Sequence, residues 1–415
     1  TKPYYFDEEE RKRAVLEGRE NQLPKFDEKE RYAYYQAHKP VREQEEAVGH
    51  AVRAVYLYSG MADVARLTED DAMYAACQRL WENIVREKLY VTGGIGGTSH
   101  GESFSFPFDL PNDTSYSETC AAIGLAFFAR RMLEIKAESQ YADVCELALY
   151  NTVLSGMALD GKSFFYVNPL EVLPEACHKD FHKSHVKPVR QKWFGCACCP
   201  PNIARIVSSV ASYAYTERKD TLWFHLYMGS VLTKMVGGQE INLCVETDMP
   251  WNGHVSVKFH TQEAVSCTLA MRIPGWSVKG NATVVCGGVA AGISWEKGGG
   301  QLYVVQGSLK EVSVQDGYLY LSGAWQEGDC ISLAFSMEVH IVCANERVRE
   351  DIGKAAFIRG PVVYCIEEAD NGKDLHLYNI DAARLGTDCQ NAVVEMSEEL
   401  GHPMAVLRVP GKRRL

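Results

Sequence analysis

Three cysteines lie within four positions in the stretch GCACCPPN, which covers residues 195–202. Disulfide geometry needs Cβ vectors that converge, so neighbouring cysteines do not easily pair with each other. Thiolates are good zinc ligands, but a free cysteine can also fill a small apolar space in a protein core. From the spacing of Cys196, Cys198 and Cys199 alone, a metal site and a packing role both remain open.

A long glycine-rich segment, residues 91–120, supplies candidate partners for these cysteines. It reads VTGGIGGTSHGESFSFPFDLPNDTSYSETC and contains two glutamates and one further cysteine. A long irregular loop between helices often carries an active site. One carboxylate and three thiolates suit tetrahedral zinc, and the sequence offers such a set in Glu118, Cys120, Cys198 and Cys199. The spacing of these four residues is not that of a zinc finger.

The spacing of Glu118 and Cys120 restricts the local backbone. Two residues that are two positions apart lie about 200° apart around a regular helix, so both cannot face one metal ion from within it. We therefore expect Glu118 to lie at or before the start of the following helix, with Ser117 or Ser115 as its cap.

The chain changes character near residue 217. Before it, apolar residues recur with helical periodicity, which predicts helices at about 41–59, 69–88, 118–136, 140–157 and 201–216. After it, short alternating apolar runs are separated by Asn-Gly, Gly-Gly and Pro-Gly turns, a pattern typical of β-sandwiches. The fold class is thus multidomain, α then β, with a helical domain over 1–216, a β-sandwich domain over 217–340 and a second, incomplete β-sandwich domain over 341–415.

Composition limits the partners and the compartment. The 415 residues carry a net charge of −11, which argues against nucleic acid or an anionic membrane as the main partner. No apolar run approaches the roughly 20 residues of a membrane span. The 14 cysteines mostly sit alone in apolar runs, as buried reduced thiols do, and the polar N-terminus shows no secretory signal. These features predict a cytoplasmic location.

Several uncommon motifs occur together in this chain. GGIGGTSHGESF, SYSETCA, FFYVNPL and CACCPPNIAR resemble the signatures of glycoside hydrolase family 127, the β-L-arabinofuranosidase family. The likeness continues through MRIPGWS, GDCISLAF and IRGPVVYCIEEADN, and so extends over nearly the whole chain. The resemblance implies a retaining glycosidase that releases L-arabinose from β-L-arabinofuranosides or a related sugar, with Zn²⁺ as its cofactor and a zinc-bound cysteine as its nucleophile.

The same resemblance implies roles for individual residues. Glu102 of HGESF corresponds to the general acid/base, and Cys198 corresponds to the nucleophile. His50 in AVGHAVR and Tyr166 in FFYVNP correspond to substrate-binding residues. The zinc ligands would be Glu118, Cys120, Cys198 and Cys199. Cys196 has no counterpart role and is interpreted either as a residue that supports the metal ligands or as a packing residue.

The family resemblance also implies an (α/α)6 barrel followed by β-sandwich domains. A barrel of that type needs twelve helices, whereas residues 1–216 offer about seven. We therefore expect only the C-terminal half of the barrel. Either the chain is a fragment of a longer protein, or its helices are completed in another way, for example in a homodimer.

Two other functions compete with the glycosidase. One is an α/α-barrel sugar isomerase or epimerase, which the CCPPN motif disfavours. The other is a non-catalytic carbohydrate-binding or scaffold protein, because closed four-ligand zinc sites are usually structural. Glu102 favours an enzyme over a scaffold, since a structural zinc site does not need a further carboxylate in this loop.

Overall fold

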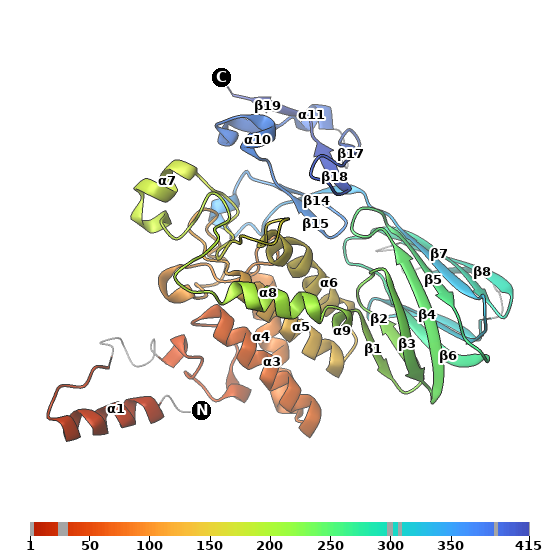
Figure 1. Cartoon of the computed structure of the whole chain (residues 1–415), viewed down its shortest axis with the longest axis horizontal. Coiled ribbons are helices and arrows are strands. Elements are labelled where there is room, and N and C mark those ends of the chain that lie inside the picture. The colour runs from red at the N-terminus through yellow and green to blue at the C-terminus, as the bar shows by residue number, and fades with distance from the viewer. Residues whose placement is uncertain (1–3, 24–31, 297–301, 306–308, 386–388, 415) are drawn as a thin grey trace. The chain divides into compact units, whose positions relative to one another are not determined.

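The computed structural model describes residues 4–23, 32–296, 302–305, 309–385 and 389–414, and it forms two compact units (Figure 1). The helical unit comprises residues 1–136, 147–208 and 345–352. The β unit comprises residues 137–146, 209–344 and 353–415. The chain is therefore helical first and β-rich afterwards, although a short helical segment before residue 147 belongs to the β unit.

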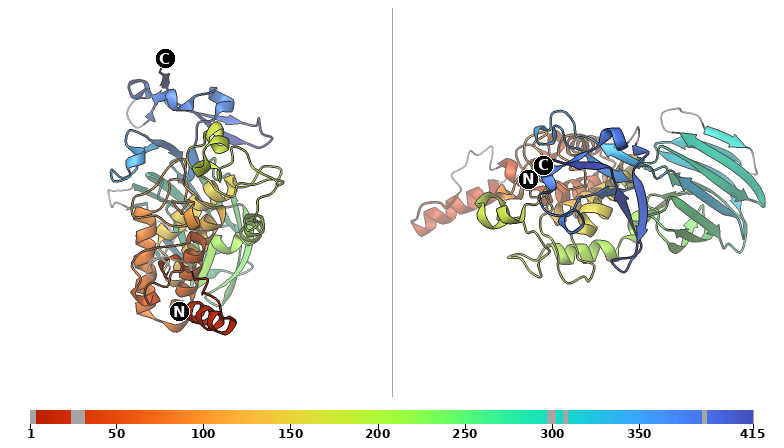
Figure 2. Two further views of the ribbon diagram at one scale, coloured as in Figure 1. Left: turned by 90° about the vertical axis from the view of Figure 1, so that its left-hand side faces the viewer. Right: turned by 90° about the horizontal axis from the view of Figure 1, so that it is seen from above.

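The helical unit is built around helix α5, which packs against α3 and α8, while α3 also packs against α4 (Figures 1 and 2). Close approach of α3 and α5 depends on Gly124, where a Cβ atom would lie 2.4 Å from Val55 Cγ2. Trp81 of α4 and Phe128 of α5 meet edge to face in the buried core, with ring centroids 5.5 Å apart. The α-helices outside the β unit are α1 (Tyr4–Glu17), α3 (Ala51–Thr68), α4 (Asp71–Glu87), α5 (Thr119–Ile135), α7 (Pro174–Lys179) and α8 (Cys199–Ser208).

Three helix boundaries differ from the sequence-based expectation. The helix expected over 41–59 begins only at Ala51, because Gly49 has φ +72° and a Cβ there would lie 2.4 Å from backbone carbonyl oxygens of residues 33 and 34. The helix expected over 140–157 is α6 (Ser139–Ala148), continued by a π-helical turn, Leu149–Val153. The helix expected over 201–216 begins at Cys199 and ends at Ser208, before the short α9 (Ala211–Ala214).

Two sheets make up most of the β unit. One has the strand order β1-β2-β6-β11-β10 and the other β3-β4-β5-β12-β7-β8-β9; every pairing is antiparallel except β2 with β6. Phe259 of β5 stacks on Trp325 of β11 at 4.6 Å, so buried side chains of the two sheets face each other. The strands are β1 (Tyr215–Arg218), β2 (Thr221–Phe224), β3 (Ser230–Val236), β4 (Gln239–Thr247), β5 (His254–Phe259), β6 (Val265–Arg272), β7 (Lys279–Cys286), β8 (Val289–Glu296), β9 (Leu302–Val305), β10 (Glu311–Gln315), β11 (Tyr318–Trp325) and β12 (Cys330–Phe335).

The C-terminal part differs from the second β-sandwich that the sequence predicts over 341–415. Its described residues form a three-stranded sheet and two separate strand pairs. These strands have only three to five residues, and most of β17 is exposed, so there is little apolar face to bury against a second sheet. The elements are β13 (Val339–Val342), β14 (Ala356–Arg359), β15 (Val362–Tyr364), α10 (Glu368–Asn371), β16 (Tyr378–Ile380), α11 (Ala382–Leu385), β17 (Val393–Ser397), β18 (Met404–Arg408) and β19 (Gly411–Arg413).

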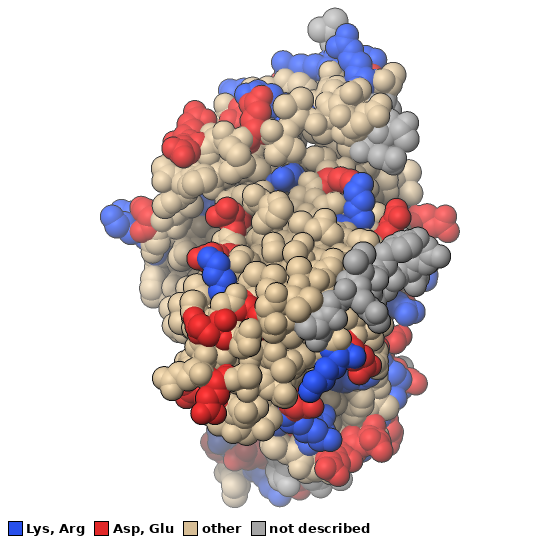
Figure 3. Space-filling view, turned by 90° about the vertical axis from the view of Figure 1, so that its right-hand side faces the viewer, with Lys and Arg blue, Asp and Glu red and all other residues tan. Residues whose placement is uncertain are grey.

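Charged side chains of both signs are scattered over the face of the molecule shown in Figure 3. On this face, lysine and arginine side chains lie among aspartates and glutamates. Exposed strand positions pair across the sheet, as in Lys258 with Glu246 at 2.7 Å. Among the helices in the described ranges, none combines the length and apolar character that crossing a membrane requires.

A buried ionic cluster joins α6 to the sheet within the β unit. The fully buried Arg272 of β6 lies 2.5 Å from Asp143 and also binds Glu146, and both carboxylates come from α6. Trp276 donates its indole N–H to Glu146 at 2.8 Å. Removal of one member of such a cluster leaves the remaining charged groups without a partner, which is strongly destabilising. We therefore expect this cluster to be important for the attachment of α6 to the sheet.

We predict that Arg272→Met destabilises the β unit by about 3–5 kcal/mol, because it leaves the buried Glu146 without a cation and removes the partner of the partly exposed Asp143. The urea midpoint of that unit should fall by about 1–2 M, measured by hydrogen exchange of the amides of β6 and β11. Arg408→Met is the control, since Arg408 and its partner Glu395 are exposed and such pairs contribute about 0–1 kcal/mol. Equal shifts in the two variants would contradict the prediction.

Candidate functional site

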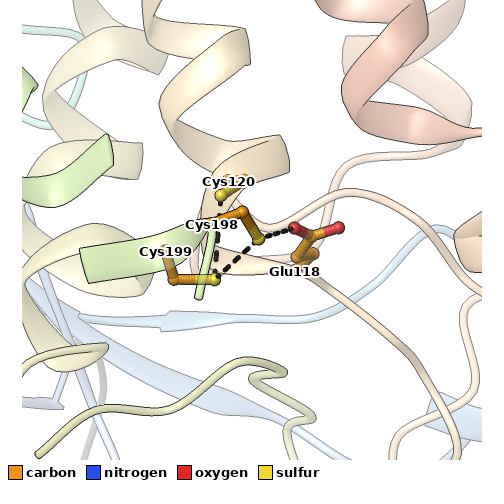
Figure 4. Close-up of side chains that lie close together, drawn as sticks. All are labelled: Glu118, Cys120, Cys198 and Cys199. Carbon is orange, nitrogen blue, oxygen red and sulfur yellow. Dashed lines mark hydrogen bonds between the residues drawn. The ribbon is translucent and has the colours of Figure 1, made fainter. Parts of the chain in front are cut away.

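Four donor atoms converge where the first turns of α5 and α8 meet in the helical unit (Figure 4). The sulfur of Cys199 lies 3.7 Å from the sulfurs of both Cys120 and Cys198. The sulfur of Cys198 lies 3.3 Å from Glu118 Oε1, and all four donors lie within 4.8 Å of one another. Donors that are about 2.0–2.3 Å from a tetrahedral zinc ion are roughly 3.3–3.8 Å apart. The donor types and these three separations therefore fit zinc.

Glu118 lies just before α5, as expected from the helical geometry. Its backbone is extended, with φ −62° and ψ 136°, and Thr119 begins the helix. The expected serine cap is wrong: Glu118 itself occupies the N-cap position without a capping hydrogen bond, and Ser117 has φ +39°. The segment is held instead by Tyr166, whose backbone carbonyl accepts a hydrogen bond from the N–H of Thr119 at 3.0 Å.

The other two sulfurs are placed by the start of α8. Cys199 is the first residue of this helix and is fully buried, and Cys198 directly precedes it and is partly exposed. Pro200 and Pro201 occupy the first turn, where a missing N–H costs no hydrogen bond. The positive end of the helix dipole favours negative charge on the adjacent sulfurs. The same sequence feature thus ends the loop, starts the helix and presents the thiols.

The cluster carries too many acidic groups to ionise together without a cation. Burial first, and then the nearby Cys198 sulfur, raise the pKa of Glu118 to about 9. Hydrogen bonds from the thiols of Cys120 and Cys199, followed by one from the Tyr166 hydroxyl at 3.2 Å, lower the pKa of Cys198. Donating to Cys198 raises the pKa of Cys120, and hydrogen bonding to the two neighbouring sulfurs raises that of Cys199.

One further atom points to a ligand at this position. Glu118 Oε2 is buried and has no hydrogen-bond partner among the described residues. An unpaired buried carboxylate oxygen is costly, and a metal ion beside it would remove that cost. Because a divalent cation also lets several thiols ionise at once, both observations favour a metal at the four donors.

Glu102 lies beside this cluster in a short turn, His100–Glu102. Its Oε2 is 3.1 Å from His50 Nε2, and its Oε1 accepts a hydrogen bond from the Tyr116 hydroxyl at 2.9 Å. These two hydrogen bonds, that of His50 being the stronger influence, lower the pKa of Glu102 against the opposing effect of burial. Oxygens of Glu102 and Glu118 lie within 4.8 Å of His50 and of each other.

A pocket of about 660 Å³ opens onto these groups. It brings together every residue that the sequence singled out for the site except Cys199, which lies behind the pocket wall. Its lining residues are His50, Val52, Tyr56, Glu102, Glu118, Cys120, Tyr166, Cys196, Cys198, Pro201, Asn202 and Arg205.

Sequence reasoning missed one side of this pocket. The side chain of Asn202 accepts a hydrogen bond from the Tyr56 hydroxyl at 3.1 Å, and Arg205 lies 4.5 Å from the centre of the Phe127 ring. Asn202 and Arg205 follow Cys199 at intervals of three residues on α8. This helical spacing after CCPPN was the available signal. Nothing in the sequence indicated Tyr56, because it lies in an ordinary apolar helix pattern.

The family relationship follows from the whole sequence. Residues 8–212 match the family described as "Beta-L-arabinofuranosidase, GH127 catalytic domain". Residues 221–337 match its middle domain, and residues 339–405 match the C-terminal domain of the same family. The chain belongs to glycoside hydrolase family 127. It resembles a curated protein, the non-reducing end β-L-arabinofuranosidase of Bifidobacterium longum subsp. longum, with 40% identity over 378 residues.

Solved family 127 structures share this fold. A β-L-arabinofuranosidase from Geobacillus stearothermophilus T6 superimposes with a TM-score of 0.85 at 43% identity, covering 98% of this chain and 59% of that one. A second structure, of a β-arabinofuranosidase, has a TM-score of 0.78 at 36% identity, covering 92% of this chain and 56% of that one. The match to the Bifidobacterium protein covers 89% of this chain and 53% of that protein. The chain thus spans about half the length of its curated relative.

We predict that Cys198 is the most readily alkylated thiol of the cluster in chelator-treated protein. Its lowered pKa gives Cys198 a larger thiolate fraction at pH 6 than an ordinary thiol, which has a pKa near 8.5 and is almost entirely protonated there. Iodoacetamide at pH 6, followed by peptide mass spectrometry, should label Cys198 well before Cys120 or Cys199. Adding zinc back should slow the labelling of Cys198 at least about tenfold, since coordination occupies the sulfur. Preferential labelling of Cys120 would contradict the charge distribution described above.

Proposed function

We propose that this family 127 chain carries the catalytic centre of a zinc-dependent, retaining β-L-arabinofuranosidase. The observation that supports it most is the convergence of Glu118, Cys120, Cys198 and Cys199 in the pocket that also contains Glu102. Two of the relatives, from Bifidobacterium longum and Geobacillus stearothermophilus, are β-L-arabinofuranosidases, which supports the sugar. The substrate would be a β-L-arabinofuranoside or a closely related glycoside, and the product L-arabinose.

Four side chains would hold the metal: Glu118, Cys120, Cys198 and Cys199. Bound zinc would keep its thiol ligands deprotonated at neutral pH. Cys198 is the ligand best suited to react, because it is partly exposed and lines the pocket, whereas Cys199 is fully buried. This difference also argues against a purely structural site, in which no ligand needs to face a pocket.

In the first step, the Cys198 sulfur attacks the anomeric carbon and forms a C–S bond. The bond from that carbon to the leaving oxygen breaks, and Glu102 gives this oxygen its proton. In the second step, the now anionic Glu102 takes a proton from water. The water oxygen attacks the same carbon, and the C–S bond breaks to return the thiolate. Two inversions at one carbon retain its configuration.

The neighbouring side chains orient these groups. Tyr166 hydrogen-bonds the Cys198 sulfur at 3.2 Å and would stabilise it both as the attacking and as the leaving thiolate. His50 hydrogen-bonds Glu102 and lines the pocket, so it can also reach a sugar hydroxyl. His50 and Tyr166 are therefore the proposed substrate-binding residues.

The domain architecture of family 127 is proposed for this chain as well. We infer that α3, α4, α5 and α8 form part of an (α/α)6 barrel, and that the two large facing sheets form a β-sandwich. The domains would then be 1–216, 217–340 and 341–415. A homodimer would be one way to cover the exposed Leu67 of α3, which is 71% accessible.

The metal assignment predicts the effect of ligand replacement. Cys120→Ser should reduce bound zinc from about one ion per chain and weaken binding at least about 10²-fold, because a buried thiolate ligand is lost. Metal content is measured by mass spectrometry after dialysis against a competing chelator. Cys196→Ser is the matched control, since Cys196 belongs to the same CACC stretch but is exposed and outside the four donors. Unchanged zinc in Cys120→Ser would exclude the assigned site.

The acid/base assignment is tested with aryl β-L-arabinofuranosides of graded phenol acidity in the natural full-length protein. Cys198→Ser should abolish turnover of all of them. Glu102→Gln should slow poor leaving groups by about 10²–10⁴-fold but largely spare the first step with acidic phenols. The glycosyl adduct should then accumulate on Cys198, because the base for the second step is missing, and intact-mass and peptide analysis detect it. An adduct on Glu118, or equal losses for all leaving groups, would overturn the mechanism.

A further inference from the structure

Glu102, the proposed acid/base, has an unfavourable backbone conformation. Glu102 has φ +54°, in the left-handed region that non-glycine residues rarely occupy. Gly101 before it has φ +67°, and a Cβ there would lie 2.8 Å from the ring of Tyr34. The Glu102 side chain is 34% exposed, so core packing does not fix its direction. Its orientation therefore depends on its hydrogen bonds.

The two hydrogen bonds of Glu102 come from residues in different surroundings. His50, on Oε2, lines the pocket, where a substrate would contact it. Tyr116, on Oε1, is not among the pocket-lining residues of the described chain. A bound sugar can compete for the hydrogen bond of His50, whereas that of Tyr116 lies outside its reach.

The ring of Tyr116 is itself held on two sides. It stacks on His185 at 5.8 Å with an interplanar angle of 26°, and His185 Nε2 lies 3.2 Å from the carbonyl oxygen of Thr114. Its other contact is edge to face with Tyr166 at 5.9 Å. Tyr166 hydrogen-bonds the sulfur of Cys198. One packed pair of tyrosines thus contacts both the proposed acid/base and the proposed nucleophile.

We propose that Tyr116 is a positioning residue for Glu102. Its hydroxyl holds Oε1 away from the pocket, so that Oε2 is the oxygen that gives the proton to the leaving group and later takes one from water. Its packing on Tyr166 sets the separation between Oε2 and the Cys198 sulfur. The inference rests on the proposed function, because it assumes that Glu102 is the acid/base.

Tyr116→Phe tests this role, because it removes the hydroxyl and keeps the ring. With alkyl or sugar leaving groups, kcat should fall about 10–10²-fold, a part of the 10²–10⁴ that general acid catalysis typically supplies. KM should change little, since Tyr116 does not face the substrate. With an acidic phenol, the first step should be spared, and mass spectrometry should find the glycosyl adduct on Cys198. Zinc content should stay at the wild-type level.

A matched control separates positioning from a general loss of structure. Tyr90 is another tyrosine near this loop; it is buried, whereas Tyr116 is partly buried, and its hydroxyl donates to the carbonyl of Pro111 at 3.1 Å. Tyr90→Phe should affect all leaving groups alike and should not trap the adduct. If Tyr116→Phe shows the same uniform behaviour, or loses zinc, the positioning role is wrong.

The Glu102→Gln variant, assayed in parallel, tells which claim has failed. Leaving-group dependence in Glu102→Gln but not in Tyr116→Phe overturns only the inference about Tyr116. Absence of that dependence in Glu102→Gln overturns the proposed function, and the inference with it. The dependence in both variants, smaller in Tyr116→Phe, supports both claims.

Discussion

Three sulfurs and a buried carboxylate that lie within 4.8 Å of one another form the constraint on which the helical unit depends. Negative charges so close together repel, and burial with the nearby Cys198 sulfur raises the pKa of Glu118 to about 9, so a cation beside these donors would favour the ionised carboxylate. Two helix starts must meet at this point, because Cys120 belongs to α5 and Cys199 to α8. Metal binding and the packing of these two helices are therefore linked.

The metal-binding residues and the proposed acid/base differ in how firmly the structure holds them. The cysteines and Glu118 come from helix starts that are packed into the core, which fixes their separation. Glu102 comes from a loop with left-handed residues at 101 and 102, and only hydrogen bonds orient it. A group that must serve first as an acid and then as a base gains from this arrangement, because its carboxyl can respond to different partners in the two steps.

The β unit has a stabilising ionic cluster of its own. Arg272 and the carboxylates of Asp143 and Glu146 fasten α6 to the sheet that contains β6. The chain leaves α6 through a π-helical turn, Leu149–Val153, and then returns to the helical unit. Residues from 147 onward lead to Tyr166 and the cysteine cluster. The ion pairs of α6 therefore lie within the β unit, and the chain re-enters the helical unit at residue 147.

The sequence by itself determined the donor types, the order of the motifs and the position of Glu118 before α5, because helical geometry is local and two positions cannot place both residues on one face. Through the family resemblance it also singled out Glu102, His50 and Tyr166 as candidate site residues, and all three line the pocket. The tertiary structure alone decided the rest. The helix expected from residue 41 starts at 51, because Gly49 packs against carbonyls of a preceding segment. The contact between Tyr116 and Glu102 depends on how a loop folds back over 14 residues, and no spacing rule encodes such a long-range side-chain meeting.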